Sequence, residues 1–144
     1  MKIMAIDFGD RHIGLAVSDD TASICGAAWT MDEYDFDRAA RRVADEAADR
    51  GVSSMVLGLP KNMDGSLGVR AERSLEFAEL LREYSKLPVT LWDERRTTVD
   101  AHRILSENGK RGKKRKKVVD AVAAALILEG YLGTLRGSGE SDRS

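Results

Sequence analysis

Residues 2–18 read K-I-M-A-I-D-F-G-D-R-H-I-G-L-A-V-S and hold two apolar stretches around a polar turn. The first stretch, residues 2–7, is apolar on both faces, which is typical of a strand in the middle of a sheet. Residues 7–10 supply turn-forming side chains. Apolar residues then alternate over 12–18. The pattern predicts a β-hairpin made of strands 2–7 and 12–18.

The rest of the chain continues this hairpin into a third strand and then into helix–strand alternation. Helical spacing begins after Asp35, and Gly51 is a C-terminal stop signal for that helix. The elements expected around it are a strand over 22–30, a strand over 53–59, a helix from Ser66, as its cap, to about Tyr84, a strand over 88–92, a helix capped by Thr97 or Thr98 and ended by Asn108-Gly109, and a last helix over about 117–135.

This order of elements predicts an α/β protein with a mixed five-stranded sheet, in which a three-strand meander precedes βα units and helices flank the sheet. It is the order of the ribonuclease-H-like fold. No linker or internal repeat interrupts it, so a single domain is expected over residues 1–135. The last residues, 136–144, are glycine, serine and charged residues, and we expect them to be disordered.

Composition narrows the class of protein. The chain has 144 residues, of which 42% are hydrophobic and 33% charged, as in a globular domain that needs no disulfide. Cys25 is the single cysteine, which excludes an internal disulfide and a cysteine-based zinc site. The strand pattern starts at the N-terminus, and no apolar run is long enough for a membrane helix. For these reasons we expect a cytoplasmic protein. No phosphate-binding loop of the P-loop NTPase type is present.

The charge distribution is uneven. Residues 110–117 read K-R-G-K-K-R-K-K and carry seven positive charges, whereas the whole chain has a net charge of −1 and the remainder therefore −8. Such a run is often a solvated surface segment. This run directly precedes the last predicted helix, which carries the acidic residue Asp120. We therefore expect it to bind nucleic-acid phosphates instead, through Lys113, Lys114, Arg115, Lys116 and Lys117.

Three carboxylates follow or begin apolar elements. Asp7 ends the first strand, Glu94 follows the strand 88–92, and Asp120 lies in the first turns of the most apolar helix. Each has an ordinary explanation: a turn residue for Asp7, and the favourable electrostatics of a helix start for the other two. Two adjacent strand ends and one helix start would nevertheless bring all three into one cleft, where Mg²⁺ or Mn²⁺, as two ions, would offset their repulsion.

Four motifs make the sequence resemble the YqgF/RuvX family, whose members are described as pre-16S rRNA nucleases and as Holliday-junction-resolvase-like proteins. They are I-D-F-G-D-R-H-I-G-L-A-V-S-D (6–19), G-L-P-K-N-M-D-G-S (58–66), W-D-E-R-R-T-T-V-D-A (92–101) and V-D-A-V-A-A-A-L-I-L-E-G-Y-L (119–132). The resemblance implies a ribonuclease-H-like, metal-dependent nuclease with acidic residues at Asp7, Glu94 and Asp120. One departure is Arg11-His12, where the family often has a Lys-Arg type pair.

These observations predict a metal-dependent endonuclease that processes the 5′ end of pre-16S rRNA, with ribosomal precursor particles as candidate partners. Arg11 and Arg95 are expected to contact phosphates, although Arg95 could instead pair with Asp93 or Asp100. Three alternatives stay open at this point. They are a DNA junction resolvase, which needs two active sites on a dimer, an actin-like or sugar-kinase ATPase, and a non-catalytic RNA-binding assembly factor.

Overall fold

The structure is a computed structural model that describes residues 1–9, 12–62, 64–93 and 121–135. The expected helix after Thr97 or Thr98, the basic run 110–117 and the tail 136–144 lie outside the described residues. Within them, no helix has the length and apolar character needed to cross a membrane.

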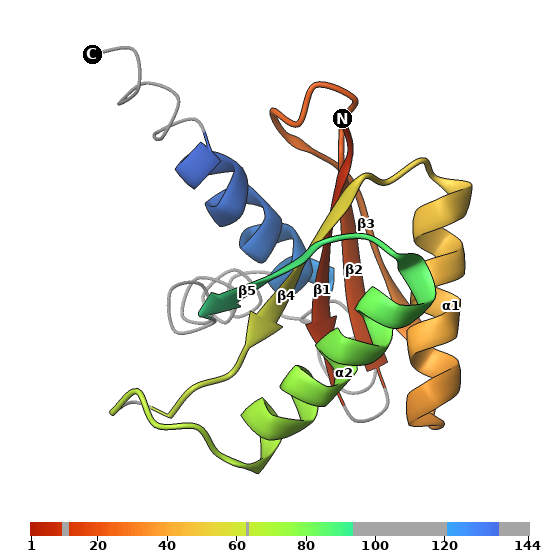
Figure 1. Cartoon of the computed structure of the whole chain (residues 1–144). Coiled ribbons are helices and arrows are strands. Elements are labelled where there is room, and N and C mark those ends of the chain that lie inside the picture. Colours follow the sequence, from red (N-terminus) through yellow and green to blue (C-terminus); the bar gives the residue numbers. More distant parts are fainter. Residues whose placement is uncertain (10–11, 63, 94–120, 136–144) are drawn as a thin grey trace, which may run out of the picture.

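A five-stranded mixed sheet forms the centre of the molecule (Figure 1). The strand order is β3-β2-β1-β4-β5. The sheet is mixed, as predicted from the meander followed by βα units, with β1 antiparallel to β2 and parallel to β4. Because β1, β4 and β5 are parallel, their carboxyl ends lie at one edge of the sheet. The strands are β1 (Ile3–Phe8), β2 (His12–Ser18), β3 (Cys25–Asp32), β4 (Ser54–Leu59) and β5 (Val89–Asp93).

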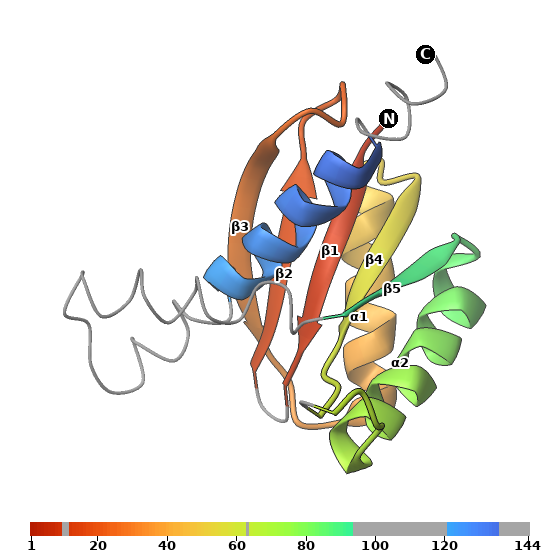
Figure 2. The same cartoon turned by 90° about the vertical axis from the view of Figure 1, so that its left-hand side faces the viewer.

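Helices cover both faces of this sheet. Helices α1 (Phe36–Asp49) and α2 (Val69–Ser85) lie on one face, and the helix over residues 121–135 crosses the other (Figures 1 and 2). β1 has apolar side chains on both faces because it contributes to two cores. Its Met4 and Ile6 belong to the core under α1 and α2, and its Ile3 and Ala5 belong to the core under helix 121–135.

The predicted first helix is confirmed at both ends. The carboxylate of Asp35 accepts a hydrogen bond from the backbone N–H of Arg38 at 2.7 Å, which caps the start of α1. Gly51 follows the helix with a φ of +71°, a conformation that glycine adopts without the steric penalty of a side chain.

Two expectations about element starts are wrong. Ser66 does not cap α2, because its N–H and hydroxyl both donate to the carboxylate of Asp64, at 2.9 and 2.6 Å. The cap is Gly68, and the helix begins at Val69. The third strand begins at Cys25 instead of residue 22. Asp19 closes a turn before it by accepting hydrogen bonds from Thr21 and Ser23.

Close packing of helix 121–135 on β5 depends on one glycine. A Cβ atom on Gly130 would lie 2.7 Å from Cζ2 of Trp92, whereas a Cβ on Gly133 of the same helix would have no atom within 4 Å.

We expect Gly133→Ala to stabilise the protein by about 0.5–1 kcal/mol through helix propensity. We expect Gly130→Ala to be less stable than Gly133→Ala by about 1–3 kcal/mol, because it overpacks the contact. Urea unfolding monitored by circular dichroism measures both, and equal stabilisation by the two variants would contradict this packing.

Candidate active site at the carboxyl edge of the sheet

Asp7 is the penultimate residue of β1 and is half-buried. Side chains alternate between the faces of a strand. Since Ile3 and Ala5 pack in the core under helix 121–135, Asp7 projects on that same face. The sequence-based expectation that Asp7 lies at the end of a buried strand is confirmed, and its carboxylate lies at the edge where β1, β4 and β5 all end.

The strand register places glycines on both sides of Asp7. Gly14 of β2 is its direct antiparallel partner. On the other side, Ile6 is aligned with Leu57, so the next position along β4 is Gly58. Neither neighbour has a side chain that could cover the carboxylate. The sheet therefore leaves room on both flanks of Asp7 for a ligand on the face of helix 121–135.

Asp93 ends β5 but belongs to the opposite face. Val89 packs in the core under α1 and α2, Leu91 packs against that core, and Trp92 packs in the core under helix 121–135. Alternation therefore directs Asp93 toward the side of α2, away from Asp7. Glu94, the next residue in the sequence, lies outside the described residues.

The expectation that the two acidic strand ends are adjacent is wrong. β4 lies between β1 and β5 in the sheet. Two strand spacings of about 4.8 Å separate the backbones of β1 and β5 by about 10 Å. The chain passes from β4 through α2 to β5, which lies on the side of β4 away from β1. A cleft that joins the carboxyl ends of β1 and β5 must therefore cross β4, at Gly58.

The helix over residues 121–135 packs across this face. Its buried residues are Ala124, Ile127, Leu128 and Leu132, which meet Ile3, Ala5, Ala16 and Val56 of the sheet. In Figures 1 and 2 its light-blue beginning lies nearer the carboxyl end of β1 than its dark-blue end does. Asp120 directly precedes Ala121 in the sequence and lies outside the described residues.

The remaining site candidates also lie outside the described residues: Arg11, Arg95, Lys113, Lys114, Arg115, Lys116 and Lys117. Of the three predicted catalytic carboxylates, the structure thus places Asp7. Among the residues it describes, no group of three or more His, Cys, Asp or Glu side chains has the geometry of a metal site.

A histidine–carboxylate pair that the sequence did not predict lies near Asp7. Nδ1 of His12, at the start of β2, is 2.5 Å from Oδ1 of Asp32, at the end of β3. The two residues are cross-strand partners in the β2–β3 register. The turn at Asp19 pairs Ser18 with Cys25, and an irregularity between Val17 and Ser18 then shifts the register by one residue, so that residue 12 faces residue 32. Nothing in the sequence signals this shift.

Helix α1 holds the end of β3 that carries Asp32. Nη1 of Arg42 donates to the carbonyl oxygen of Asp32 at 2.9 Å and to the carboxylate of Glu33 at 3.2 Å. Burial raises the pKa of Glu33. Hydrogen bonds from the N–H of Asp35 and from Arg42 outweigh burial, so the pKa lies below its ordinary value. Glu33 therefore stays ionised near neutral pH and keeps Arg42 in place.

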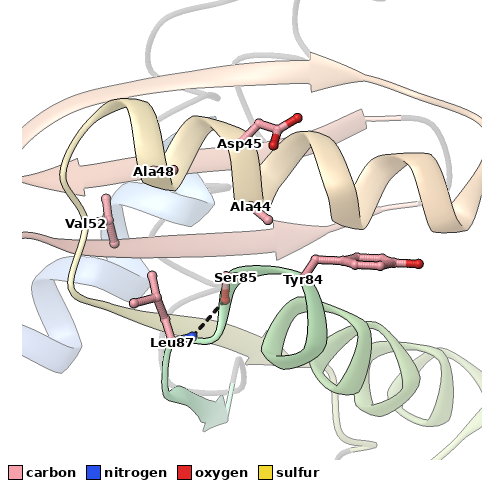
Figure 3. A pocket seen from close by; sticks show the side chains of 7 residues that line it. All are labelled: Ala44, Asp45, Ala48, Val52, Tyr84, Ser85 and Leu87. Carbon is pink, nitrogen blue, oxygen red and sulfur yellow. Dashed lines mark hydrogen bonds between the residues drawn. The ribbon is translucent and has the colours of Figure 1, made fainter.

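A pocket of about 230 Å³ lies at the other edge of the sheet (Figure 3). Its lining residues are Ala44, Asp45, Ala48, Val52, Tyr84, Ser85 and Leu87. Val52 and Leu87 precede the starts of β4 and β5, so the pocket is at the amino ends of the parallel strands. It is on the side of α1 and α2 and is separate from Asp7.

Comparison with known proteins identifies the family. The family described as "RuvX: Holliday junction resolvase" matches residues 1–134, nearly the whole chain. This chain belongs to the RuvX family. Its activity class is that of a nuclease, as the resemblance in the four motifs predicted. The family assignment disfavours the ATPase alternative.

Curated relatives are similar to this RuvX chain over nearly their full length. A protein of Caldanaerobacter subterraneus named "Putative pre-16S rRNA nuclease" is 40% identical over 140 residues, which is 96% of this chain and 100% of the relative. A protein of Desulfitobacterium hafniense with the same name is 45% identical over 136 residues, 94% of each chain.

Solved structures confirm the ribonuclease-H-like fold of this RuvX chain. Thermus thermophilus RuvC in complex with a Holliday junction substrate has a TM-score of 0.61 at 16% identity and covers 93% of this chain and 97% of its own. Fowlpox virus resolvase in complex with Holliday junction DNA has a TM-score of 0.57 at 14% identity, with 94% and 99% covered. At these identities the similarity concerns the fold alone.

Proposed function

We propose that this chain is a divalent-metal-dependent endonuclease that acts in 5′-end processing of pre-16S rRNA in the cytoplasm. Asp7, Glu94 and Asp120 are its proposed metal ligands. The observation that carries the proposal is the position of Asp7, which is half-buried at the carboxyl edge of the sheet and flanked by Gly14 and Gly58. The names of the curated relatives support RNA as the substrate.

Strand and helix periodicity support the participation of the other two carboxylates. Glu94 is two residues beyond Trp92, which packs on the face of Asp7, so strand alternation continued by one residue would place Glu94 on that face. Asp120 is four residues before Ala124, which is buried against the sheet, so helical spacing extended by one residue would place Asp120 on the sheet side as well. Both inferences start from described neighbours.

The proposed donor set fits a hard divalent cation. Two carboxylates about 4 Å apart repel by roughly 4 kcal/mol at an effective dielectric constant near 20, so three together need a counter-charge. Carboxylate oxygens are the ligands that Mg²⁺ and Mn²⁺ prefer. Such ions, when bound, supply Lewis-acid activation of water and stabilisation of the departing oxygen, most effectively as a pair.

The protein itself supplies access and phosphate binding. Gly14 and Gly58 leave open the flanks of Asp7, where a sugar-phosphate backbone can approach. Arg11 and Arg95 are proposed to hold phosphate oxygens near the scissile bond. The basic run 113–117, which precedes Asp120, is proposed to neutralise further phosphates along the RNA.

The test is cleavage of an end-labelled RNA that spans the 5′ end of the 16S precursor, alone and within precursor particles. We expect discrete cutting with MnCl₂ or MgCl₂ and none with EDTA. Cutting that persists in EDTA would contradict metal dependence. RNA binding without cutting, lost on charge reversal of residues 113–117, would favour the non-catalytic assembly factor instead.

A DNA junction resolvase is the second candidate, because the family description names a Holliday junction resolvase. Symmetric cutting of a four-way junction needs two active sites, and therefore a dimer. A labelled DNA junction in the same assay, with sedimentation at micromolar concentration, separates the two functions. A dimer that cuts the junction and leaves the precursor RNA intact would replace our proposal with the resolvase.

A further inference from the structure

His12 and Asp32 form a dyad on the same face of the sheet as Asp7. Gly14 and Ala16 share the alternation of His12 along β2, and Ala16 packs in the core under helix 121–135. The one irregularity in the β2–β3 register is at residues 17 and 18, beyond this stretch. His12 therefore projects toward the side on which Asp7 lies.

The spacing between His12 and Asp7 suits a shared substrate. Gly14 is directly opposite Asp7, so His12 is the diagonal neighbour, two residues along β2. Diagonal neighbours in an antiparallel pair are about 7–8 Å apart at the backbone. A phosphodiester group placed between the two side chains would lie within reach of both.

The dyad holds its imidazole in one orientation. The carboxylate of Asp32 accepts from Nδ1, at 2.5 Å, which leaves Nε2 as the nitrogen available for a substrate. No hydrogen bond to Nε2 is formed among the residues that the structure describes. The His12 side chain is 15% exposed and that of Asp32 49%, so the imidazole is largely enclosed while the carboxylate remains solvated. Arg42 fixes the Asp32 backbone.

We propose that His12 is a catalytic residue of the nuclease, a general acid that protonates the leaving oxygen, and that Asp32 is the residue that positions it. This inference rests on the proposed nuclease function. A water oxygen forms a bond to phosphorus while the bond from phosphorus to O3′ breaks. The electron pair of the broken bond stays on O3′, which takes the Nε2 proton of the imidazolium form of His12 and leaves the neutral ring with its proton on Nδ1. The imidazole regains a proton from solvent, which receives the one that the water loses.

A sulfur leaving group provides the sharpest test. A 3′-bridging phosphorothiolate departs as a thiolate and needs no proton donor. We expect His12→Gln to cut the normal substrate about 100-fold more slowly, with KM little changed. The same variant should cut the phosphorothiolate at nearly the wild-type rate. An equal loss on both substrates would show a structural role for His12 and would overturn the proposal.

Variants of the partner carboxylate provide a matched control. Asp32→Ala should reproduce part of the loss on the normal substrate. Asp45→Ala removes an exposed carboxylate at the opposite edge of the sheet and should leave the rate unchanged. Equal rates for these two variants would overturn the role of Asp32.

A tautomer measurement separates this proposal from the nuclease function. Nitrogen-detected NMR of the histidine rings in the intact protein needs no turnover. We expect neutral His12 to carry its proton on Nδ1, and Asp32→Ala to shift the population toward the Nε2-protonated tautomer. A proton found mainly on Nε2 in the wild type would overturn the dyad even if the RNA is cut. Failure of wild-type protein to cut any substrate would overturn the general-acid role together with the proposed function, whatever the tautomer.

Discussion

Replacing Asp7 by asparagine is expected to lower the rate of metal-dependent cleavage on the order of a thousandfold. Loss of a charged ligand removes about 4 kcal/mol of transition-state stabilisation, and each 1.36 kcal/mol is a factor of ten in rate. Asparagine has nearly the same shape and volume as aspartate, so the substitution leaves no cavity and adds no atom to the packing around β1. The free energy of unfolding should therefore change by less than about 1 kcal/mol.

Single-turnover cleavage of the labelled RNA measures this loss, and Asp93→Asn is the matched control. Asp93 is also an aspartate at the carboxyl end of a strand, but alternation along β5 directs it to the opposite face. The Asp93 variant should stay within a fewfold of the wild-type rate. If Asp93→Asn were inactive and Asp7→Asn active, the cleft would lie on the side of α2 and our assignment would be wrong.

Phe77→Ala is expected to destabilise the protein by about 3–5 kcal/mol. Phe77 of α2 is fully buried and stacks on Phe8, with ring centroids 4.3 Å apart. It also makes an edge contact with Phe36 at the start of α1, at 5.5 Å. The substitution removes the ring that joins β1, α1 and α2, and these close-packed elements cannot fully close the cavity.

Urea unfolding measures this effect, with Glu76→Ala as the neighbouring control on the same helix. Glu76 is exposed, so its removal should change the free energy of unfolding by no more than about 0.5 kcal/mol. Similar values for the two variants would show that the phenylalanine cluster does not hold the helix layer on β1.

The same cluster shows where sequence reasoning fails inside a helix. Helical spacing alone favours Leu75, Ala78 and Leu81 as the inward residues of α2. Ala78 and Leu81 are buried, but Leu75 is half-buried and Phe77 occupies the centre of the core. Several apolar side chains on α2 compete for the inward side, and the positions of Phe8 and Phe36 on other elements decide which one fills it.

The start of α2 illustrates a local competition of the same kind. Serine is a good helix cap, and residue 66 precedes an apolar run, so the prediction was reasonable. Asp64 lies two residues earlier and captures both the N–H and the hydroxyl of Ser66. Two side chains that can both accept backbone N–H groups compete for the same hydrogen bonds when they are this close. Their spacing in the sequence does not show which of them forms those bonds.

The sequence by itself determined the order of the elements, the central hairpin and the position of Asp7 at a strand end, because these depend on short-range alternation and turn chemistry. It also indicated the family through four motifs. Only the tertiary structure decided that β4 separates β1 from β5, that Asp7 and Asp93 point to opposite faces, and that His12 meets Asp32. These features depend on strand order and register, which arise from packing between residues far apart in the chain.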